Sequence, residues 1–339
     1  MDSDIALSYS VTTLTLLFLI IGLVLNAVAL VVFYDVPKLL RSTINTLVRN
    51  LFVVHLWTVL VLGPLVSFDC QAHTQQRLGR NNFSAFETYP STCSLFCTSV
   101  RFLREFFTTS VSAILWIMVL DRTMTIVLPK SPSTLYLKRN PTLCTLVACL
   151  LAAVGQAHSF FGLFFEEGSR VCEVALHQTL WSYLPESFFL TQVSALVLVS
   201  LILLIKLRSA PPKYATGSMK RIVLLVVILI ASYIMCTTPQ KMSRFLRDSA
   251  VQPKILETMS LMSIFAHPLI YYMISVNFRK ALRRSIRRRA SALTSRHASR
   301  SPENVNAALS VTAFSITSET TARQSSSNTH RGVACACEK

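Results

Sequence analysis

Long apolar runs alternate with short polar segments along most of this chain. The first run, residues 12–33, contains few polar residues, and about 20 apolar residues in a helix are enough to cross the hydrocarbon core of a bilayer. Further runs follow at residues 45–68, 143–165, 187–205, 222–245 and 255–276, and a third one lies within the stretch 97–129, where residues 106–120 are apolar. The pattern predicts an all-α membrane protein with seven transmembrane helices.

The composition supports a membrane protein. Of the 339 residues, 52% are hydrophobic and 14% are charged, whereas soluble proteins carry about 25% charged residues. A cleaved signal peptide is another interpretation of the first run, but no basic segment precedes it and the run is long for such a peptide. The net charge of +17 would suit a nucleic-acid-binding protein. The basic residues, however, lie between the apolar runs and after the last one, so we expect no nucleic-acid partner.

The basic residues also indicate the orientation of the helices. The segments after the first, third and fifth runs are basic, and residues 279–300 contain nine Lys or Arg and no acidic residue. Basic segments stay on the cytoplasmic side, so we expect the C-terminus inside and, with seven helices, the N-terminus outside. The expected parts are an extracellular segment (1–10), a seven-helix domain (11–276), an amphipathic helix on the membrane lipids (277–290) and a disordered cytoplasmic Ser/Thr-rich tail (291–339).

Particular polar residues and prolines stand at defined places in the apolar runs. The third stretch begins at Cys97 and ends near the pair Asp121-Arg122. The step of 25 residues from Cys97 to Arg122 corresponds to about 37 Å in a helix, enough to cross a bilayer. The others are Asn26 in the first run, His55 in the second, Pro239 in the sixth, and His267, Pro268 and Tyr271 in the seventh.

These residues and their spacing resemble the rhodopsin-like class of G-protein-coupled receptors, over about residues 10–290. In that family a cysteine begins the third helix, an Asp-Arg pair ends it, and the seventh helix ends in Asn-Pro-x-x-Tyr. The resemblance implies a seven-helix bundle with a short eighth helix, in the plasma membrane. It implies a receptor that passes an extracellular ligand signal to heterotrimeric G proteins, with arrestin and receptor kinases as further partners. It also implies a disulfide between Cys97 and Cys172.

The resemblance gives a coupling role to Asp121, Arg122, Pro239, Pro268 and Tyr271. In the family the arginine contacts its neighbouring aspartate at rest and meets the G protein when the sixth helix swings outward. Pro239 should bend that helix because proline cannot donate a backbone hydrogen bond. The alternative is that Arg122 only anchors its helix at the cytoplasmic surface. No acidic residue begins the sixth run, so we expect no ion pair from there to Arg122.

Some residues depart from the family pattern. His55 replaces an aspartate of the second helix, His267 an asparagine of the seventh, and Thr237 a tryptophan of the sixth. Because hard cations prefer oxygen ligands, the two histidines predict poor sodium binding. We expect them to face each other as a neutral hydrogen-bonded pair. A pH-sensitive pair is a second hypothesis, and a zinc bridge, which lacks further ligands, is a third. Asn26 is expected to face other helices.

Charged residues near the expected extracellular ends of the helices form a candidate ligand site. Arginine binds carboxylate and phosphate groups through parallel hydrogen bonds, so this set predicts a small anionic ligand. In the alternative, the residues pair among themselves at a solvated rim, Arg101 with Glu105 and Lys241 with Glu257. The members of the set are Arg101, Arg104, Lys241, Arg244 and Glu257.

The expected extracellular loop at residues 69–96 carries two covalent signals. Asn82 begins an Asn-Phe-Ser acceptor sequence for N-glycosylation. Cys70 and Cys93 flank the loop, and the sequence leaves open whether they form a second disulfide or stay unpaired.

Other function classes fit the sequence less well. No Ser/His/Asp, Cys/His or phosphate-loop arrangement occurs, so we expect neither an enzyme nor a metal or cofactor site. A transporter or channel predicts internal repeats and helices broken by Gly or Pro, whereas the chain has eight glycines and no visible repeat. An atypical receptor, which recruits arrestin or does not signal, remains an alternative because of His55, His267 and Thr237.

Overall fold

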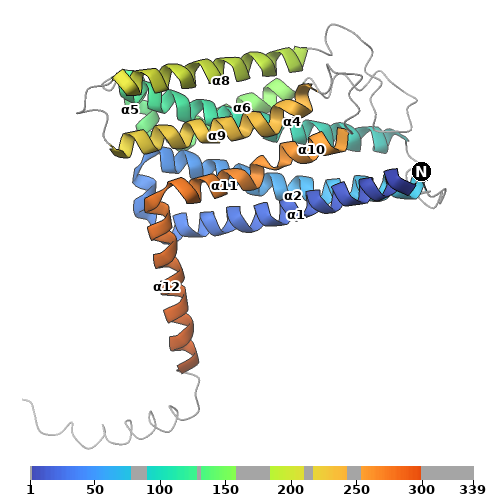
Figure 1. Cartoon of the computed structure of the whole chain (residues 1–339), viewed down its shortest axis with the longest axis horizontal. Coiled ribbons are helices and arrows are strands. Elements are labelled where there is room, and N and C mark those ends of the chain that lie inside the picture. Colours follow the sequence, from blue (N-terminus) through green and yellow to red (C-terminus); the bar gives the residue numbers. More distant parts are fainter. Residues whose placement is uncertain are drawn as a thin grey trace, which may run out of the picture. The chain divides into compact units, whose positions relative to one another are not determined.

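The computed structural model describes residues 2–77, 90–127, 131–157, 184–209, 217–242 and 253–298, and helices are the secondary structure of these ranges (Figure 1). The chain divides into two compact units, Met1–Arg283 and Arg284–Lys339. The first unit holds every helix up to α11 and the first residues of α12. The helices are α1 (Asp2–Asp35), η1 (Pro37–Arg41), α2 (Thr43–Arg77), α4 (Pro90–Val127), α5 (Pro132–Arg139), α6 (Pro141–Gln156), α8 (Leu184–Ser209), α9 (Gly217–Met242), α10 (Pro253–Leu261), α11 (Ser263–Ile274) and α12 (Val276–Ala298).

Five helices of the described residues are long and apolar enough to cross a membrane. A sixth candidate is the bent pair Thr258–Ile274 and Val276–Ala292, if it is counted as one span. The chain is therefore a multi-pass helical membrane protein with five to six candidate spans. The five are Ser10–Asp35, Thr43–Pro64, Phe102–Val127, Phe189–Ser209 and Met219–Met242.

These spans confirm five of the predicted apolar runs, namely the first, second, third, fifth and sixth. For the fourth run, α6 is apolar but has only 16 residues, and the rest of that run, from residue 158, lies outside the described residues. Two helix ends differ from the predicted boundaries. α1 begins at Asp2, inside the segment expected to precede the first span, and α12 continues to Ala298, past residue 290.

The seventh predicted run is two helices rather than one. Between α10 and α11 the backbone tightens at Met262, whose N–H bonds to the Met259 carbonyl over 3.1 Å. The Ser263 hydroxyl donates to the Ser260 carbonyl over 3.0 Å, so this carbonyl accepts a hydrogen bond from a side chain at the break. After Ser275 the chain turns into α12, where Phe278 packs into the core with 3% exposure.

A short helix, α5, lies in the basic segment after α4 and was not predicted. Its signal is present in the sequence, because Ser131 is followed by Pro132 at the first helical position. The Ser131 hydroxyl accepts a hydrogen bond from the Thr134 N–H at 3.2 Å, which satisfies one free donor at the start of the helix.

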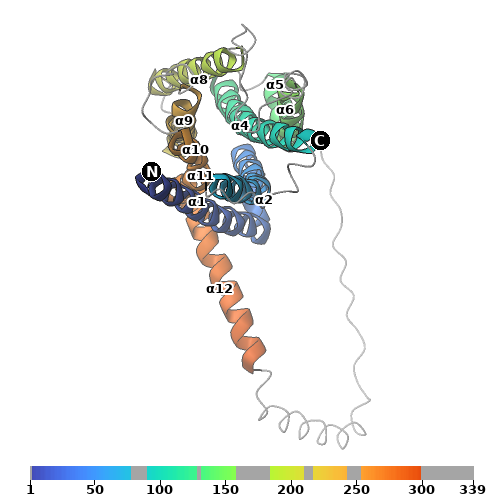
Figure 2. The same ribbon diagram turned by 90° about the vertical axis from the view of Figure 1, so that its right-hand side faces the viewer.

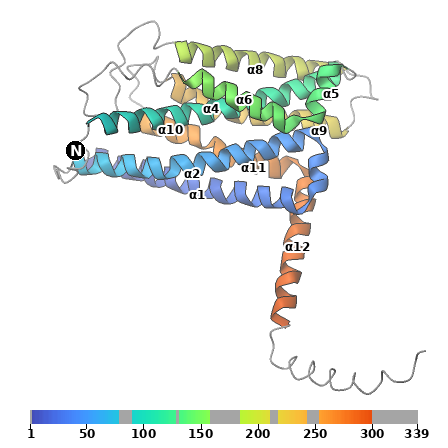
Figure 3. The same ribbon diagram turned by 180° about the vertical axis from the view of Figure 1, so that it is seen from behind.

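α4 is the central helix of the first unit. It contacts α2, α6, α8 and α9, and Figure 2, which looks along the helices, shows it among them. α1 lies beside α2 and α11, as Figure 3 shows from behind. The main core lies where these helices meet, and its fully buried members include Leu47, Leu51, Ile114, Leu115, Met118 and Leu229.

The outward faces of the helices are apolar too. On α1, Leu17 and Ile20 are 50% and 59% exposed, and on α6, Leu151 and Val154 are 67% and 74% exposed. In water such faces would attract partners or aggregate, whereas in a bilayer the surrounding lipid covers them. The distribution agrees with a membrane-embedded bundle.

Candidate functional site

Asp121 and Arg122 lie near the C-terminal end of α4 and are buried, with 0% and 7% exposure. The Arg122 Nε donates to Asp121 Oδ2 over 2.8 Å, and the guanidinium Nη2 bonds to the same oxygen. A buried charge pair costs desolvation energy that its hydrogen bonds only partly offset. An arginine that only anchored α4 at the membrane surface would lie in the interface, where water hydrates it. Arg122 is thus held inside the bundle by the neighbouring carboxylate of its own helix.

An apolar cluster lies at the same end of the bundle, which we call the Arg122 end. Its buried members are Leu203 and Leu207 of α8 and Val223 of α9, and Ile126, one turn beyond Arg122 on α4, packs against them. α9 contains no acidic residue, which agrees with the expectation that Arg122 finds no ion-pair partner there. Contacts between apolar side chains, rather than an ion pair, hold α9 against α4 and α8 here.

Tyr271 lies near the same end of α11, with 1% exposure. Its hydroxyl donates to the Asn45 Oδ1 over 2.9 Å and so joins α11 to α2. Its ring packs against Phe33, Phe52 and Phe278, with centroid distances of 5.9, 5.8 and 4.9 Å. Sequence reasoning named Tyr271 but missed Asn45, whose role depends on how α2 and α11 pair in space.

His55 and His267 face each other in the middle of the bundle, as the sequence predicted. The distance from His55 Nε2 to His267 Nδ1 is 2.8 Å, and the residues are 1% and 0% exposed. One nitrogen must donate and the other accept, and burial disfavours any added charge, so the contacts support the neutral pair. Among the described residues no group of three or more His, Cys, Asp or Glu could hold a metal ion. A zinc bridge therefore has no third ligand there.

Asn26 faces α11, as expected for a polar residue in the first span. Its Nδ2 donates to the Gly22 carbonyl over 2.7 Å and to the Ile264 carbonyl over 2.9 Å. Pro268, four residues after Ile264 in α11, has no N–H to offer that carbonyl. Asn26 thus supplies the hydrogen bond that proline removes. Sequence reasoning missed Gly22, which lets α11 approach: a Cβ there would lie 2.9 Å from Ile264 Cγ2.

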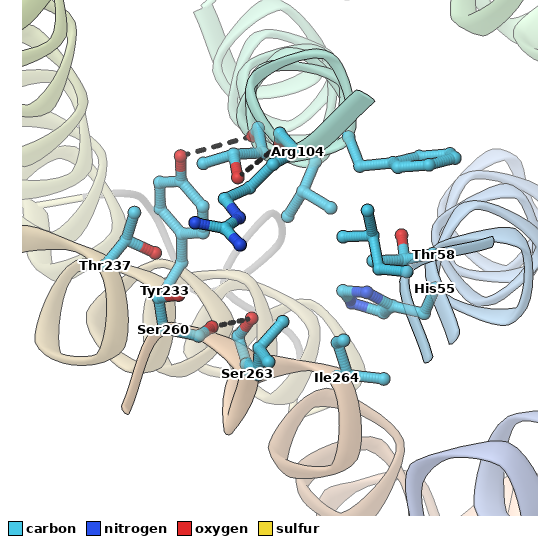
Figure 4. A pocket seen from close by; sticks show the side chains of 13 residues that line it. His55, Thr58, Arg104, Tyr233, Thr237, Ser260, Ser263 and Ile264 are labelled. Carbon is cyan, nitrogen blue, oxygen red and sulfur yellow. Dashed lines mark hydrogen bonds between the residues drawn. The ribbon is translucent and has the colours of Figure 1, made fainter. Parts of the chain in front are cut away.

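A cavity of about 30 Å³ lies between α2, α4, α9, α10 and α11 (Figure 4). This volume holds about two water molecules. His55 forms part of one wall, and the Arg104 side chain points into the cavity from α4 (Figure 4). The polar lining is mostly hydroxyl groups, contributed by Thr58, Thr108, Tyr233, Thr237, Ser260 and Ser263.

Several of these hydroxyls are held by backbone carbonyls. The Tyr233 hydroxyl donates to the Thr108 carbonyl at 3.3 Å, and the Thr108 hydroxyl donates to the Arg104 carbonyl at 2.9 Å (Figure 4). The first of these bonds crosses from α9 to α4. Arg104 is the arginine among the residues that line the cavity. The hydrogen bond from Tyr233 joins α9 to α4, the helix that carries Arg104.

Lys241, the other described cation of the predicted ligand site, is buried with 8% exposure. It forms an ion pair with Glu105 of α4, and its Nζ lies 5.9 Å from the centroid of the Phe189 ring on α8. Lys241 therefore forms an internal ion pair, as the alternative to a ligand site expected. Its partner is Glu105, which the sequence analysis had paired with Arg101. Sequence reasoning missed Phe189, whose place depends on the packing of α8.

Other predicted site residues cannot be placed as side chains. Arg101, Glu257, Cys70, Cys93 and Cys97 lie in helices, but their side chains are outside the described part of the structure. Arg244, Cys172 and Asn82 lie outside the described residues altogether. The predicted disulfides, the glycosylation site and part of the ligand set therefore stay predictions. Pro239 lies inside α9, which continues through it to Met242.

Comparison with known proteins adds no family assignment. No model of a known protein family matches this sequence, and no curated protein sequence matches it.

Proposed function

We propose that this chain is a rhodopsin-like G-protein-coupled receptor of the plasma membrane, with seven transmembrane helices, an extracellular N-terminus and a cytoplasmic C-terminus. In this proposal α6 with the residues that follow it, and α10 with α11, form the fourth and seventh membrane passages. The observation that carries the proposal is the buried Asp121–Arg122 pair near the end of a long central span. A charge pair at such a place is costly to keep unless it is used.

The mechanism is a shift between two packings of the bundle. Arg122 is buried and the cluster around Val223 packs α9 against α4 and α8 at the same end, so in this mechanism the start of α9 moves away from α4 and α8 to make Arg122 accessible. Pro239 leaves one backbone hydrogen bond of α9 unmade and gives a point about which the helix can bend. The opened cleft, lined by Arg122 and Tyr271, would then bind a heterotrimeric G protein, and later receptor kinases and arrestin.

The ligand side of the receptor lies at the other end of α4. Arg104 points into the cavity and Lys241 is buried one turn beyond Thr237, which lines it. Two cationic side chains on helices that meet at one cavity favour a small anionic ligand. Ligand binding between α4 and α9 would act on the same helix whose opposite end closes over Arg122.

The test compares nucleotide exchange on heterotrimeric G proteins for the wild-type chain and for Arg122→Ala, at matched surface expression. We expect basal exchange in the wild type and a loss of at least tenfold in Arg122→Ala, because the arginine contacts the G protein directly. Arg208→Ala is the control: it removes one positive charge from an exposed position at the same end of the bundle, and its exchange should stay near wild type. Equal exchange for Arg122→Ala and wild type would contradict the proposal.

A second candidate is a seven-helix receptor that recruits arrestin or does not signal. The His55–His267 pair favours it, because this contact replaces the acidic residue that the family uses in the middle of the bundle. Arrestin recruitment without nucleotide exchange on any G-protein class would support the second candidate over the first.

A further inference from the structure

A buried ion pair lies beside the cavity, one helical turn further along. Lys241 follows Thr237 by four residues on α9, and Glu105 follows Arg104 directly on α4. Because Thr237 lines the cavity and Lys241 lies four residues further on the same face of α9, the Lys241–Glu105 pair adjoins the cavity wall. The two charged side chains are 10% and 16% exposed, so little water reaches them.

The surroundings of Lys241 are shaped around a carboxylate. A buried ammonium group needs an acceptor, since an unpaired charge in such a place is strongly unfavourable. Glu105 supplies that acceptor from α4, while the Phe189 ring covers the ammonium from α8. The end of the Glu105 side chain has the chemistry of propionate. An external carboxylate could therefore make the same contact if Glu105 moved away.

On the basis of the receptor function proposed above, we propose that Lys241 and Arg104 form a binding site for a short monocarboxylate, and that Glu105 occupies this site when no ligand is bound. The chain thus carries its own competitor. When the ligand carboxylate takes the place of Glu105 at Lys241, the ion pair that joins α4 to α9 is broken. The free energy of ligand binding then acts on the position of α9.

The size of the site limits the ligand. The cavity of about 30 Å³ admits about two water molecules before any side chain moves. Without a larger opening of the bundle, the space beside Arg104 therefore admits only the short carbon tail of an acid whose carboxylate replaces that of Glu105 at Lys241. We choose carboxylate over phosphate because the group already held by Lys241 is a carboxylate with a single negative charge.

The test is a rescue experiment on the purified full-length chain, with propionate as the probe and propylamine and propanol as controls. Glu105→Ala leaves Lys241 without its acceptor and removes a CH2–COO− group, so the carboxylate end of propionate can occupy the vacated space. We expect this variant to melt at a lower temperature than wild type, and propionate to raise its melting temperature saturably. The concentration for half of the effect should be at least tenfold lower than in the wild type, where Glu105 competes. The amine and the alcohol should have no effect.

A double variant shows whether the rescue acts through Lys241. Glu105→Ala with Lys241→Met removes both charges, so no unpaired charge remains to unfold the chain, and its response to propionate should be lost. Arg104→Gln in the Glu105→Ala background should weaken the response. Glu105→Gln, which keeps the shape of the side chain, replaces Glu105→Ala if the latter does not fold. An equal propionate response with and without Lys241, or no gain in the Glu105 variants, would overturn the proposal.

Failure of this site and failure of the receptor function give different results. Propionate stabilisation is measured without a G protein and should persist in Arg122→Ala. If the rescue succeeds while nucleotide exchange does not depend on Arg122, the site stands and the receptor function fails. If exchange depends on Arg122 but the rescue fails, the receptor function stands without this site.

Discussion

A single residue of one helix supplies a hydrogen bond that a neighbouring helix lacks. The amide of Asn26 in α1 binds the Ile264 carbonyl, which Pro268 leaves without its helical donor. The contact requires α1 and α11 to lie very close, and Gly22 makes this possible. A polar residue, a glycine and a proline on two helices thus form one unit, although each alone would weaken its helix.

Replacing Gly22 tests the close approach of α1 and α11. In Gly22→Ala the added Cβ would lie 2.9 Å from Ile264 Cγ2, so a helix must shift, at a cost of about 1–3 kcal/mol for overpacking. We expect a lower melting temperature of the purified protein. Gly155→Ala is the control, because no atom lies within 4 Å of the Cβ it would add, and it should leave stability equal or slightly higher. Equal melting of both variants and wild type would refute the close contact.

The histidine pair predicts that sodium has no specific effect on this protein. His55 and His267 offer nitrogen atoms that already bond to each other over 2.8 Å, and sodium prefers oxygen ligands. Replacing sodium chloride with N-methylglucamine chloride at equal ionic strength should leave the melting temperature unchanged.

A double variant is the control for the sodium prediction. His55→Asp with His267→Asn places a carboxylate opposite an amide, so it should gain a sodium-dependent rise in melting temperature. A sodium-dependent shift in the wild type would contradict the neutral histidine pair as the reason for sodium insensitivity.

At the scale of helices, the ends of α4, α8 and α9 pack through side chains alone. Val223 is fully buried beside Leu203 and Leu207, and Ile126 packs against them. Apolar contacts are less directional than an ion pair, so small losses of volume weaken the closed packing without leaving an unpaired charge. The strength of this cluster therefore sets how often the Arg122 end opens in the proposed mechanism.

Trimming this cluster should raise basal signalling. Val223→Ala removes buried methyl groups from the closed packing, and a loss of about 1 kcal/mol raises the open population about fivefold. We expect basal nucleotide exchange to rise by about this factor. Leu224→Ala is the matched control, because its side chain is on the same helix but 48% exposed, and it should signal like wild type. Lower or unchanged exchange in Val223→Ala would contradict the closed cluster as a barrier to opening.

At the scale of the whole first unit, α4 and α9 connect the two ends of the bundle. α4 carries Arg104 and Glu105 near one end and Arg122 near the other, while α9 carries Lys241 and Val223 in the opposite order (Figure 1). The helices run antiparallel, so contacts at one end and contacts at the other involve the same pair. A change at Lys241 is thereby linked through α9 to the packing of Val223 at the Arg122 end, as the proposed mechanism requires.

The contacts of some residues could be predicted from the sequence, and those of others could not. The facing of His55 and His267 was predicted correctly, because each lies in an apolar run and a family resemblance aligned the runs. The internal-pairing alternative assigned Lys241 to Glu257, whereas the structure pairs it with Glu105, because the choice between acidic neighbours on different helices depends on helix rotation. The break at Met262 was also missed, because the run stays apolar on both sides of it and hydropathy does not report the backbone and side-chain hydrogen bonds found there.

The sequence by itself determined that this is a multi-pass helical membrane protein, because hydrocarbon satisfies no backbone hydrogen bond and long apolar runs must then form helices. It also marked the polar residues that lipid would not tolerate without a partner. Only the tertiary structure decided which partners they have: Asn26 with Ile264, Tyr271 with Asn45, and Lys241 with Glu105. These pairs join residues from different helices, so they depend on the rotation and depth of each helix, which hydropathy along the chain does not specify.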